Sequence, residues 1–251
     1  MSISNKLNVI YGNTPRVYES GKNEGIEQGK SEGLIEGIEL GKQAEKKEFW
    51  DLFQDYGRRK DYSMAFGGFS WGEDNFFPKY DMQVANAFEM FRNFCNRGKY
   101  GAFDMIAHLN SIGRTIDFSK CTNMSSCFTW AYISTWGVID CSSTSSLSST
   151  FANSQFVTIE KLIVHDGISY SSTFSNTKEL QNITFEGVIG KNIDFSKCVK
   201  LTYDSLMSII NALADYSGTS TTRTLTLGTT NLAKLSDEEK AIATQKGWTL
   251  A

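Results

Sequence analysis

The chain has 251 residues, enough to bury a sizeable core in one or two domains. Its 25 Lys and Arg nearly balance its 28 Asp and Glu, so charge does not indicate a nucleic acid or an anionic membrane as partner. No stretch approaches the ~18 consecutive apolar residues of a membrane-spanning helix, and the start lacks the apolar core of a signal peptide. We therefore expect a soluble protein that is made in the cytosol and does not insert into a membrane.

Residues 1–18 hold a short apolar run at 7–11, a Gly-Asn-Thr-Pro turn at 12–15 and two further apolar residues at 17–18. This pattern is typical of an extended segment with a turn. Because its apolar surface is too small to order it alone, we expect residues 1–18 to be an anchor arm that packs on another surface.

Residues 19–56 favour one long helix, because Glu and Lys are frequent and no proline interrupts them. Glycine nevertheless recurs at every fourth position, which costs about 5 kcal/mol in an isolated helix. Close approach of neighbouring helices would offset this cost, and a spacing of four would make their bundle wind right-handed. We expect a homo-oligomeric stalk, with a flexible and partly helical tether as the alternative. The predicted interface residues are Gly21, Gly25, Gly29, Gly33, Gly37 and Gly41.

Residues 57–90 are dense in aromatic residues and glycine. We interpret them as a cap that closes the first unit of the repeat described next, since the terminal units of a repeat need a cover. A site for a planar ligand is the alternative.

Three segments share one pattern: 116–128 (I-D-F-S-K-C-T-N-M-S-S-C-F), 139–151 and 162–174. Each starts with an aliphatic residue, has a second apolar residue eight positions later and ends on phenylalanine. The interval between copies is constant, a fourth copy begins later than this interval at Ile193, and residues 87–91 resemble a degenerate earlier copy. A period in the low twenties predicts a β-solenoid over residues 91–203, with one strand per unit and an internal column of Phe128, Phe151 and Phe174. A serine-rich β-sandwich is the alternative.

Residues 204–251 predict a C-terminal cap made of helix, strand, helix and strand. The first helix covers 204–213, with Asp204 or Ser205 as N-cap, and the first strand covers 224–227. The second helix covers 236–246 with Ser236 as N-cap, and the final strand covers 248–250.

The segment 129–136 is the candidate ligand face. It places Trp130 and Tyr132 where the next copy has Ala152 and Ser154, so aromatic rings replace small residues. Exposed Trp and Tyr are common in glycan and protein recognition. Packing of both rings under a neighbouring loop is the alternative, and Trp136 is expected in the core.

No pattern indicates catalysis, a cofactor or a metal site. His108 and His165 are the only imidazoles, neither belongs to a nucleophile or metal motif, and His165 with its neighbour Asp166 is expected at a turn. The five cysteines form no C-x-x-C pair, and Cys121 shares its repeat position with Cys198, which predicts small buried residues. We therefore expect a protein that is not an enzyme. A carbohydrate-active enzyme would need a carboxylate pair, which sequence spacing cannot reveal.

The repeats, clearest in I-D-F-S-K-C-T-N-M-S-S-C-F, resemble leucine-rich repeats of surface proteins from anaerobic bacteria. The ending, with L-T-Y-D-S-L-M-S-I-I-N-A-L, T-L-T-L-G and Q-K-G-W-T-L, is similar to that of virion structural proteins of phages and prophages from gut Firmicutes. V-Y-E-S-G-K, F-W-D-L-F-Q-D-Y-G and D-N-F-F-P-K-Y-D-M are similar to the N-terminal elements of the same group. The resemblance implies an α+β protein: a glycine-spaced helix, a leucine-rich-repeat-like β-solenoid, an aromatic N-terminal cap and a helix/strand C-terminal cap.

The same resemblance implies a fibre, tail, baseplate or capsid decoration protein, made in the host cytoplasm and located in the virion. Its expected partners are copies of itself (a trimer favoured), other virion proteins through residues 1–18, and a host surface glycan or protein. A bacterial cell-surface leucine-rich-repeat adhesion protein is the alternative. It would require export, so the start of the sequence disfavours it.

Overall fold

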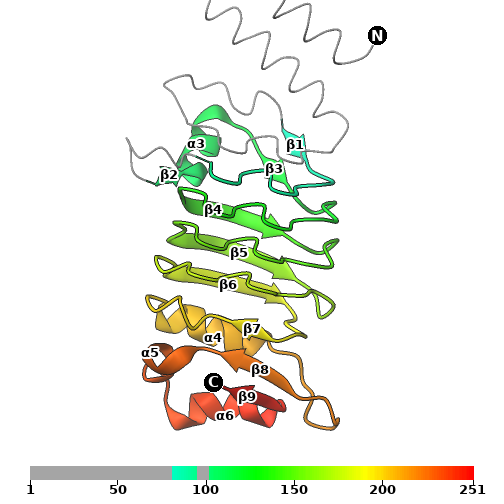
Figure 1. The fold of residues 1–251 in the computed structure, drawn as a ribbon, viewed down its shortest axis with the longest axis vertical. Helices are drawn as coiled ribbons and strands as arrows, with labels where there is room; N and C mark the ends of the chain where they lie inside the picture. The colour runs from blue at the N-terminus through cyan, green and yellow to red at the C-terminus, as the bar shows by residue number, and fades with distance from the viewer. Residues whose placement is uncertain (1–80, 95–101) are drawn as a thin grey trace, which may run out of the picture. The chain divides into compact units, whose positions relative to one another are not determined.

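The computed structural model describes residues 81–94 and 102–251, which belong to one compact unit of the chain. The anchor arm, the glycine-spaced helix and residues 57–80 of the aromatic cap lie outside the described residues. The described strands are all short and pair in parallel (Figure 1). In chain order the elements are β1 (Met82–Gln83), β2 (Phe103–Asp104), α3 (Met105–Ile112), β3 (Ile116–Asp117), β4 (Ile133–Asp140), β5 (Thr158–Val164), β6 (Asn182–Gly187), β7 (Ile193–Asp194), α4 (Tyr203–Ala212), β8 (Arg223–Thr226), α5 (Gly228–Leu232), α6 (Asp237–Gln245) and β9 (Trp248–Leu250).

The strands form three separate parallel sheets, of two, four and three strands. Their orders are β1-β3, β2-β4-β5-β6 and β7-β8-β9. Within the central sheet the register follows the sequence repeat, because Ile139 lies beside Leu162 and Leu162 lies beside Phe185. The strand positions predicted from the repeat are therefore confirmed, although the sheet that joins them is not continuous.

The I-D-x-S motif marks the point where a strand ends and a turn begins. In three copies the aspartate Oδ1 accepts a hydrogen bond from the backbone N–H two residues later, at distances of 2.7–2.8 Å. This local bond competes with continuation of the strand, so the chain leaves the sheet at the same place in each copy. The three aspartates are Asp117, Asp140 and Asp194.

A column of phenylalanine rings runs through the core and holds the successive turns together. The rings of Phe128 and Phe151 stack with their centroids 5.5 Å apart, and those of Phe151 and Phe174 with centroids 5.3 Å apart. Phe91 extends the column at one end and Phe195 at the other. All five rings are fully buried or nearly so. The predicted aromatic column is thus present, and residues 87–91 do belong to the same pattern.

The predicted fold class, an α+β protein with a leucine-rich-repeat-like β-solenoid over residues 91–203, is wrong: the described residues form three parallel sheets interrupted by short helices. The sheet β2-β4-β5-β6 ends at β6 because α4 packs against that edge. Ser205 Oγ accepts from the N–H of Ile183 (2.9 Å) and Ser208 Oγ from the N–H of Phe185 (2.8 Å). These hydroxyls bond the N–H groups that a following strand would have bonded, so the helix closes the edge. At the other edge, β2 pairs with only the first half of β4, and the chain continues directly into α3.

The C-terminal elements follow the predicted order, with two differences. The N-cap of α4 is Thr202, whose side chain accepts from the N–H of Ser205, so the predicted N-cap at Asp204 or Ser205 is wrong. The short helix α5 is not among the predicted elements. Ser236 does cap α6, in a capping box with Glu239, and Gly247 follows with a left-handed φ of 80°.

Candidate functional site

The turns of successive repeats contain a row of residues with left-handed backbone conformation. Asn93, Asn153 and Asn176 have φ values of 57–58°, and Trp130 occupies the equivalent place with φ 60°. Asparagine tolerates this conformation better than most residues. The side chains of neighbouring copies also bond each other, since Nδ2 of Asn176 donates to Oδ1 of Asn153 at 2.9 Å. Trp130 therefore aligns with Asn153, not with Ala152 as the sequence comparison suggested.

Trp130 is an exception to both backbone preference and burial. A bulky residue in left-handed conformation costs about 1–2 kcal/mol, a cost that asparagine at the same place largely avoids. Its side chain is also 45% exposed, although large aromatic residues are usually buried. An exposed aromatic ring on a backbone conformation that disfavours it is a candidate for contact with a ligand.

Tyr132 and Trp136 lie on the same segment in different environments. Tyr132 is half-buried, and its N–H donates to the carbonyl oxygen of Phe94 at 2.8 Å. Trp136 is 2% exposed and its ring contacts Phe128 with centroids 4.8 Å apart, which confirms its prediction as a core residue. Of the two predicted ligand residues, Trp130 is thus the more available to a partner.

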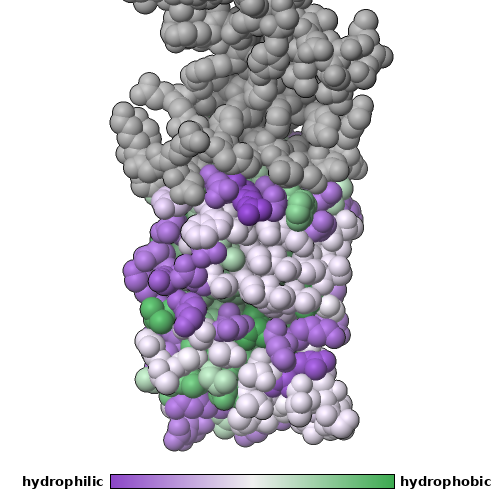
Figure 2. Space-filling model, in the orientation of Figure 1, coloured by the Kyte–Doolittle hydropathy of each residue, from purple (hydrophilic) through white to green (hydrophobic). Residues whose placement is uncertain are grey.

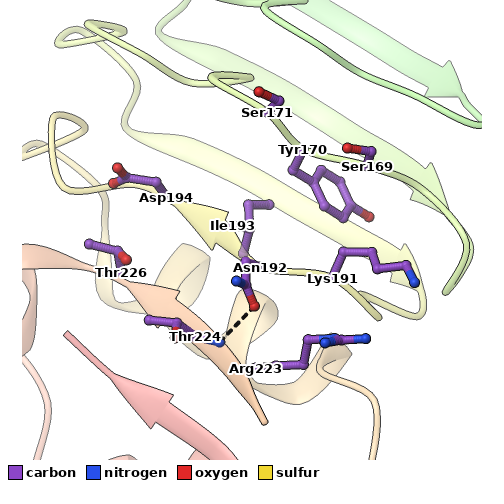
Figure 3. Close-up of a pocket in the computed structure, with 10 residues that line it drawn as sticks. All are labelled: Ser169, Tyr170, Ser171, Lys191, Asn192, Ile193, Asp194, Arg223, Thr224 and Thr226. Carbon is purple, nitrogen blue, oxygen red and sulfur yellow. Dashed lines mark hydrogen bonds between the residues drawn. The ribbon is translucent and has the colours of Figure 1, made fainter. Parts of the chain in front are cut away.

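A second feature is a polar groove of about 630 Å³ between one repeat turn and the strands β7 and β8. Figure 3 shows the side chains of three chain segments around it. On the visible face in Figure 2 the middle of the stack is largely pale, as expected for serine and threonine, and strongly hydrophilic residues surround this pale area. The groove is lined by Ser169, Tyr170, Ser171, Lys191, Asn192, Ile193, Asp194, Arg223, Thr224 and Thr226.

Contacts to the neighbouring backbone fix the position of Arg223 in this groove. Its Nε donates to the carbonyl oxygen of Gly190 at 3.1 Å and its Nη1 to that of Thr222 at 3.2 Å. The guanidinium carbon lies 5.5 Å from the ring centroid of Tyr216, and the Tyr216 hydroxyl donates to the same Gly190 oxygen at 2.8 Å. Nη2 has no partner among the described residues, so it is available to a ligand.

Gly190 allows the chain to pass close to the turn at Asp166. A Cβ at residue 190 would lie 2.3 Å from the carbonyl oxygen of Asp166, too close for any other residue. The absent side chain lets the backbone pass directly over the preceding turn before β7 begins. Asn192 then holds β8 in place, since its Oδ1 accepts from the N–H of Thr224 at 2.9 Å (Figure 3). The groove therefore has a fixed backbone frame.

Lys191 and Asp194 complete the charged lining. Both side chains are exposed, and Lys191 forms no hydrogen bond or ion pair with a described residue. Asp194 Oδ1 accepts from the N–H of Ser196 at 2.7 Å, which leaves Oδ2 free to accept elsewhere. In Figure 3 the side chains of Lys191 and Arg223 extend toward the same end of the groove, and Asp194 lies toward the other.

No local sequence pattern indicates this groove. Its lining comes from three segments far apart in the chain, and serine and threonine are frequent throughout the repeats. The signal that could have found it is the irregular spacing of the fourth copy, which begins at Ile193 instead of at Phe185, where the constant interval would place it. Neighbouring units no longer match in shape at such a break in the repeat, and a groove can form between them.

The histidines and cysteines have structural surroundings. The N–H of Gly167 donates to Nδ1 of His165 at 3.1 Å, so Nε2 carries the proton and donates to the carbonyl oxygen of Thr144 at 2.9 Å. His108 is buried, with its ring centroid 5.2 Å from that of Phe103. His165 thus stabilises a turn, as its position beside Asp166 suggested.

Burial raises the pKa of four thiols and keeps them in the neutral form at neutral pH. The pKa of Cys121 is raised to about 11 and that of Cys198 to about 12, and those of Cys127 and Cys141 are also well above the usual value. All four are free and fully buried. They pack as small apolar residues, as predicted for Cys121 and Cys198.

The predicted glycine interface, from Gly21 to Gly41, lies outside the described residues. Within residues 81–94 and 102–251, no group of three or more His, Cys, Asp or Glu side chains is arranged to hold a metal ion. None of the helices in these ranges is both long enough and apolar enough to span a membrane.

Comparison with known proteins gives no relative: no protein-family model, curated protein sequence or solved structure matches this chain.

Proposed function

We propose that this chain is a non-enzymatic structural protein of a phage virion, of the fibre, tail, baseplate or capsid decoration type. Its repeat-containing part contacts a glycan or protein on the host surface through Trp130 and Tyr132. The observation that carries the contact is Trp130 itself, which is 45% exposed at a left-handed position where three other repeats have asparagine. The virion assignment rests on the resemblance of the repeats and the two ends of the sequence.

The rest of the proposal follows from the sequence pattern. Residues 1–18 attach the protein to other virion proteins, and the glycine stripe from Gly21 to Gly41 joins copies of the chain, with a trimer favoured. The protein is made in the host cytoplasm. The alternative, a bacterial cell-surface adhesion or interaction protein, shares the repeats and the exposed Trp130. Capsid or tail genes beside the coding gene would support the virion, and their absence would favour the alternative.

The host contact is tested with Trp130→Asn, which installs the residue that the neighbouring repeats use. We expect the free energy of unfolding to stay constant or rise by about 1 kcal/mol, because asparagine adopts the left-handed conformation more easily. Binding of the labelled protein to intact Firmicutes cells should fall at least tenfold, and further in the double variant with Tyr132→Ala.

The matched control is Tyr203→Asn, which removes a 49% exposed aromatic ring from α4 and should leave cell binding unchanged. Full binding by a folded Trp130→Asn variant would place the host contact elsewhere.

The oligomer is tested by light scattering of the full-length protein and of a variant that lacks residues 1–48. We expect a trimer for the full chain and a folded monomer after the deletion, because the glycine stripe is removed. A monomer in both cases would contradict the stalk and favour the tether.

A further inference from the structure

We propose that the polar groove between the turn at residues 169–171 and the strands β7 and β8 binds a saccharide that carries a carboxylate or a phosphate. This site is separate from Trp130 and Tyr132. It rests on the proposed host contact only for the source of the ligand, a glycan of the host surface; binding by the groove is testable without it.

The charge of the groove favours an anionic group at one end. Lys191 and Arg223 extend toward the same end, and neither forms an ion pair with a described residue (Figure 3). Two cations that form no ion pair with a described residue, at the end of a concave site opposite the Asp194 carboxylate, attract an anion more strongly than the same cations on a flat surface. Arg223 is fixed by its bonds to Gly190 and Thr222, so little conformational freedom is lost when Nη2 binds an oxygen.

The remainder of the lining suits a sugar ring. The hydroxyls of Ser169, Ser171, Thr224 and Thr226 hydrogen-bond to no other described residue, and each can donate and accept. The free Oδ2 of Asp194 accepts from sugar hydroxyls at the end away from the cations. A simple inorganic anion would leave these groups unused, and an uncharged sugar would leave Lys191 and Arg223 unused.

The dimensions also favour a small ligand. Tyr170 and Ile193 are 4% and 3% exposed and contribute apolar surface to a lining that is otherwise polar. A volume of about 630 Å³ lies within the usual range of sites for small molecules, about 300–1,000 Å³. One or two sugar units fit such a site, whereas a folded protein partner would need a much larger surface.

The test is a ligand-observed NMR titration of the full-length protein at constant ionic strength. The probes are glucuronate, glucose 6-phosphate, glucose, acetate and inorganic phosphate. We expect glucuronate or glucose 6-phosphate to bind with a Kd at least fivefold lower than that of glucose and of the corresponding simple anion. The acid that binds better identifies a carboxylate or a phosphate as the preferred group. Equal binding of glucose, equal binding of the simple anion, or no binding of either acidic sugar would overturn the proposal.

Lys191→Gln then locates the site. It removes a charge without removing any hydrogen bond among the described residues, so the variant should fold normally, and the Kd of the acidic sugar should rise roughly tenfold. The matched control is Lys197→Gln, another exposed lysine outside the groove lining, with an expected change of less than twofold. An equal loss in both variants would show a general effect of net charge and contradict the groove.

Trp130→Asn separates this proposal from the previous one. It should leave binding of the acidic sugar unchanged, whether or not it reduces binding to cells. Loss of sugar binding in Trp130→Asn with retention in Lys191→Gln would move the saccharide site to Trp130 and overturn the groove.

Discussion

The repeat region, residues 116–187, and the C-terminal region, residues 203–251, both contain parallel strands but satisfy their backbone carbonyls differently. In the repeats, short buried hydroxyls bond the carbonyl oxygens of the preceding turn: Thr150 bonds that of Met124, and Thr173 bonds that of Leu147, at 2.9 and 2.8 Å. In the C-terminal region, long lysine side chains have this role. Nζ of Lys246 donates to the carbonyl oxygens of Ile210, Asn211 and Leu213 at 2.8–3.2 Å.

The difference has a physical reason. A repeated turn has an identical neighbour one strand spacing away, so a threonine hydroxyl reaches its acceptor and the same solution serves every copy. At the end of α4 the carbonyl of Ala212 accepts from the backbone N–H of Ile189, but those of Ile210 and Asn211 face no repeated turn and are bonded by Lys246. A lysine reaches further and adds a positive charge at the negative end of the helix. Regular units thus bond their carbonyls with the same short hydroxyl in successive copies, and the end of the stack does so with a single long side chain.

Replacing Phe151 by alanine should have the largest effect. Its ring is fully buried and stacks between those of Phe128 and Phe174, so the variant loses contacts on two sides and leaves a cavity. We expect the free energy of unfolding to fall by about 3–5 kcal/mol. Denaturant unfolding measures this, with Val188→Ala, which is 41% exposed, as the control. A loss below about 1 kcal/mol would show that the column does not support the repeat region.

Replacing Lys246 by methionine tests the C-terminal region. Methionine preserves the apolar stem but removes three hydrogen bonds. The carbonyl oxygens of Asn211 and Leu213 then lose their donor, whereas that of Ile210 keeps the N–H of Leu213, so we expect a loss of about 1–3 kcal/mol. Lys240→Met is the control, because Lys240 only forms an exposed pair with Asp237. Equal stability of the two variants would contradict a stabilising role for the hydrogen bonds of Lys246 in the C-terminal region.

Replacing Tyr170 by phenylalanine should raise stability slightly. Tyr170 occupies the repeat position of Met124 and Leu147, and its buried hydroxyl has no hydrogen-bond partner among the described residues. Burial also raises its pKa well above the usual value. Removing the hydroxyl should increase the free energy of unfolding by about 1 kcal/mol.

The control for this variant is Tyr216→Phe, which removes the bond to Gly190 and should decrease stability by a similar amount. Effects of the same sign in both variants would show that the hydroxyl of Tyr170 does have a partner.

Replacing Lys161 by glutamine should have the smallest effect. Lys161 and Glu186 form an ion pair of 2.6 Å across β5 and β6, but both side chains are about half exposed. Solvent screens such pairs, and we expect a loss below about 1 kcal/mol that disappears in high salt. Thermal unfolding at low and high salt measures it. A larger loss would show that charge pairs, as well as packing, hold the repeats together.

The sequence predicted the candidate sites only in part. Trp130 is identifiable because an aromatic residue stands where the neighbouring copies have asparagine, and such an interruption is visible in a single chain. The groove is not, because Lys191 and Arg223 are far apart in the chain and no local pattern joins them. Only the pairing of β7 with β8 and the close passage of Gly190 over Asp166 bring these segments to one place.

The sequence by itself determined what depends on local chemistry and on repetition. The constant interval between copies located the strands, and the recurring phenylalanine located the core column. Helical spacing located α4, and helical spacing with an N-cap serine located α6, each to within a position or two at either end. The tertiary structure alone decided whether the strands join into one sheet. That outcome depends on which surface covers the edge of β6, and in the folded protein the hydroxyls of Ser205 and Ser208 bond the N–H groups of that edge.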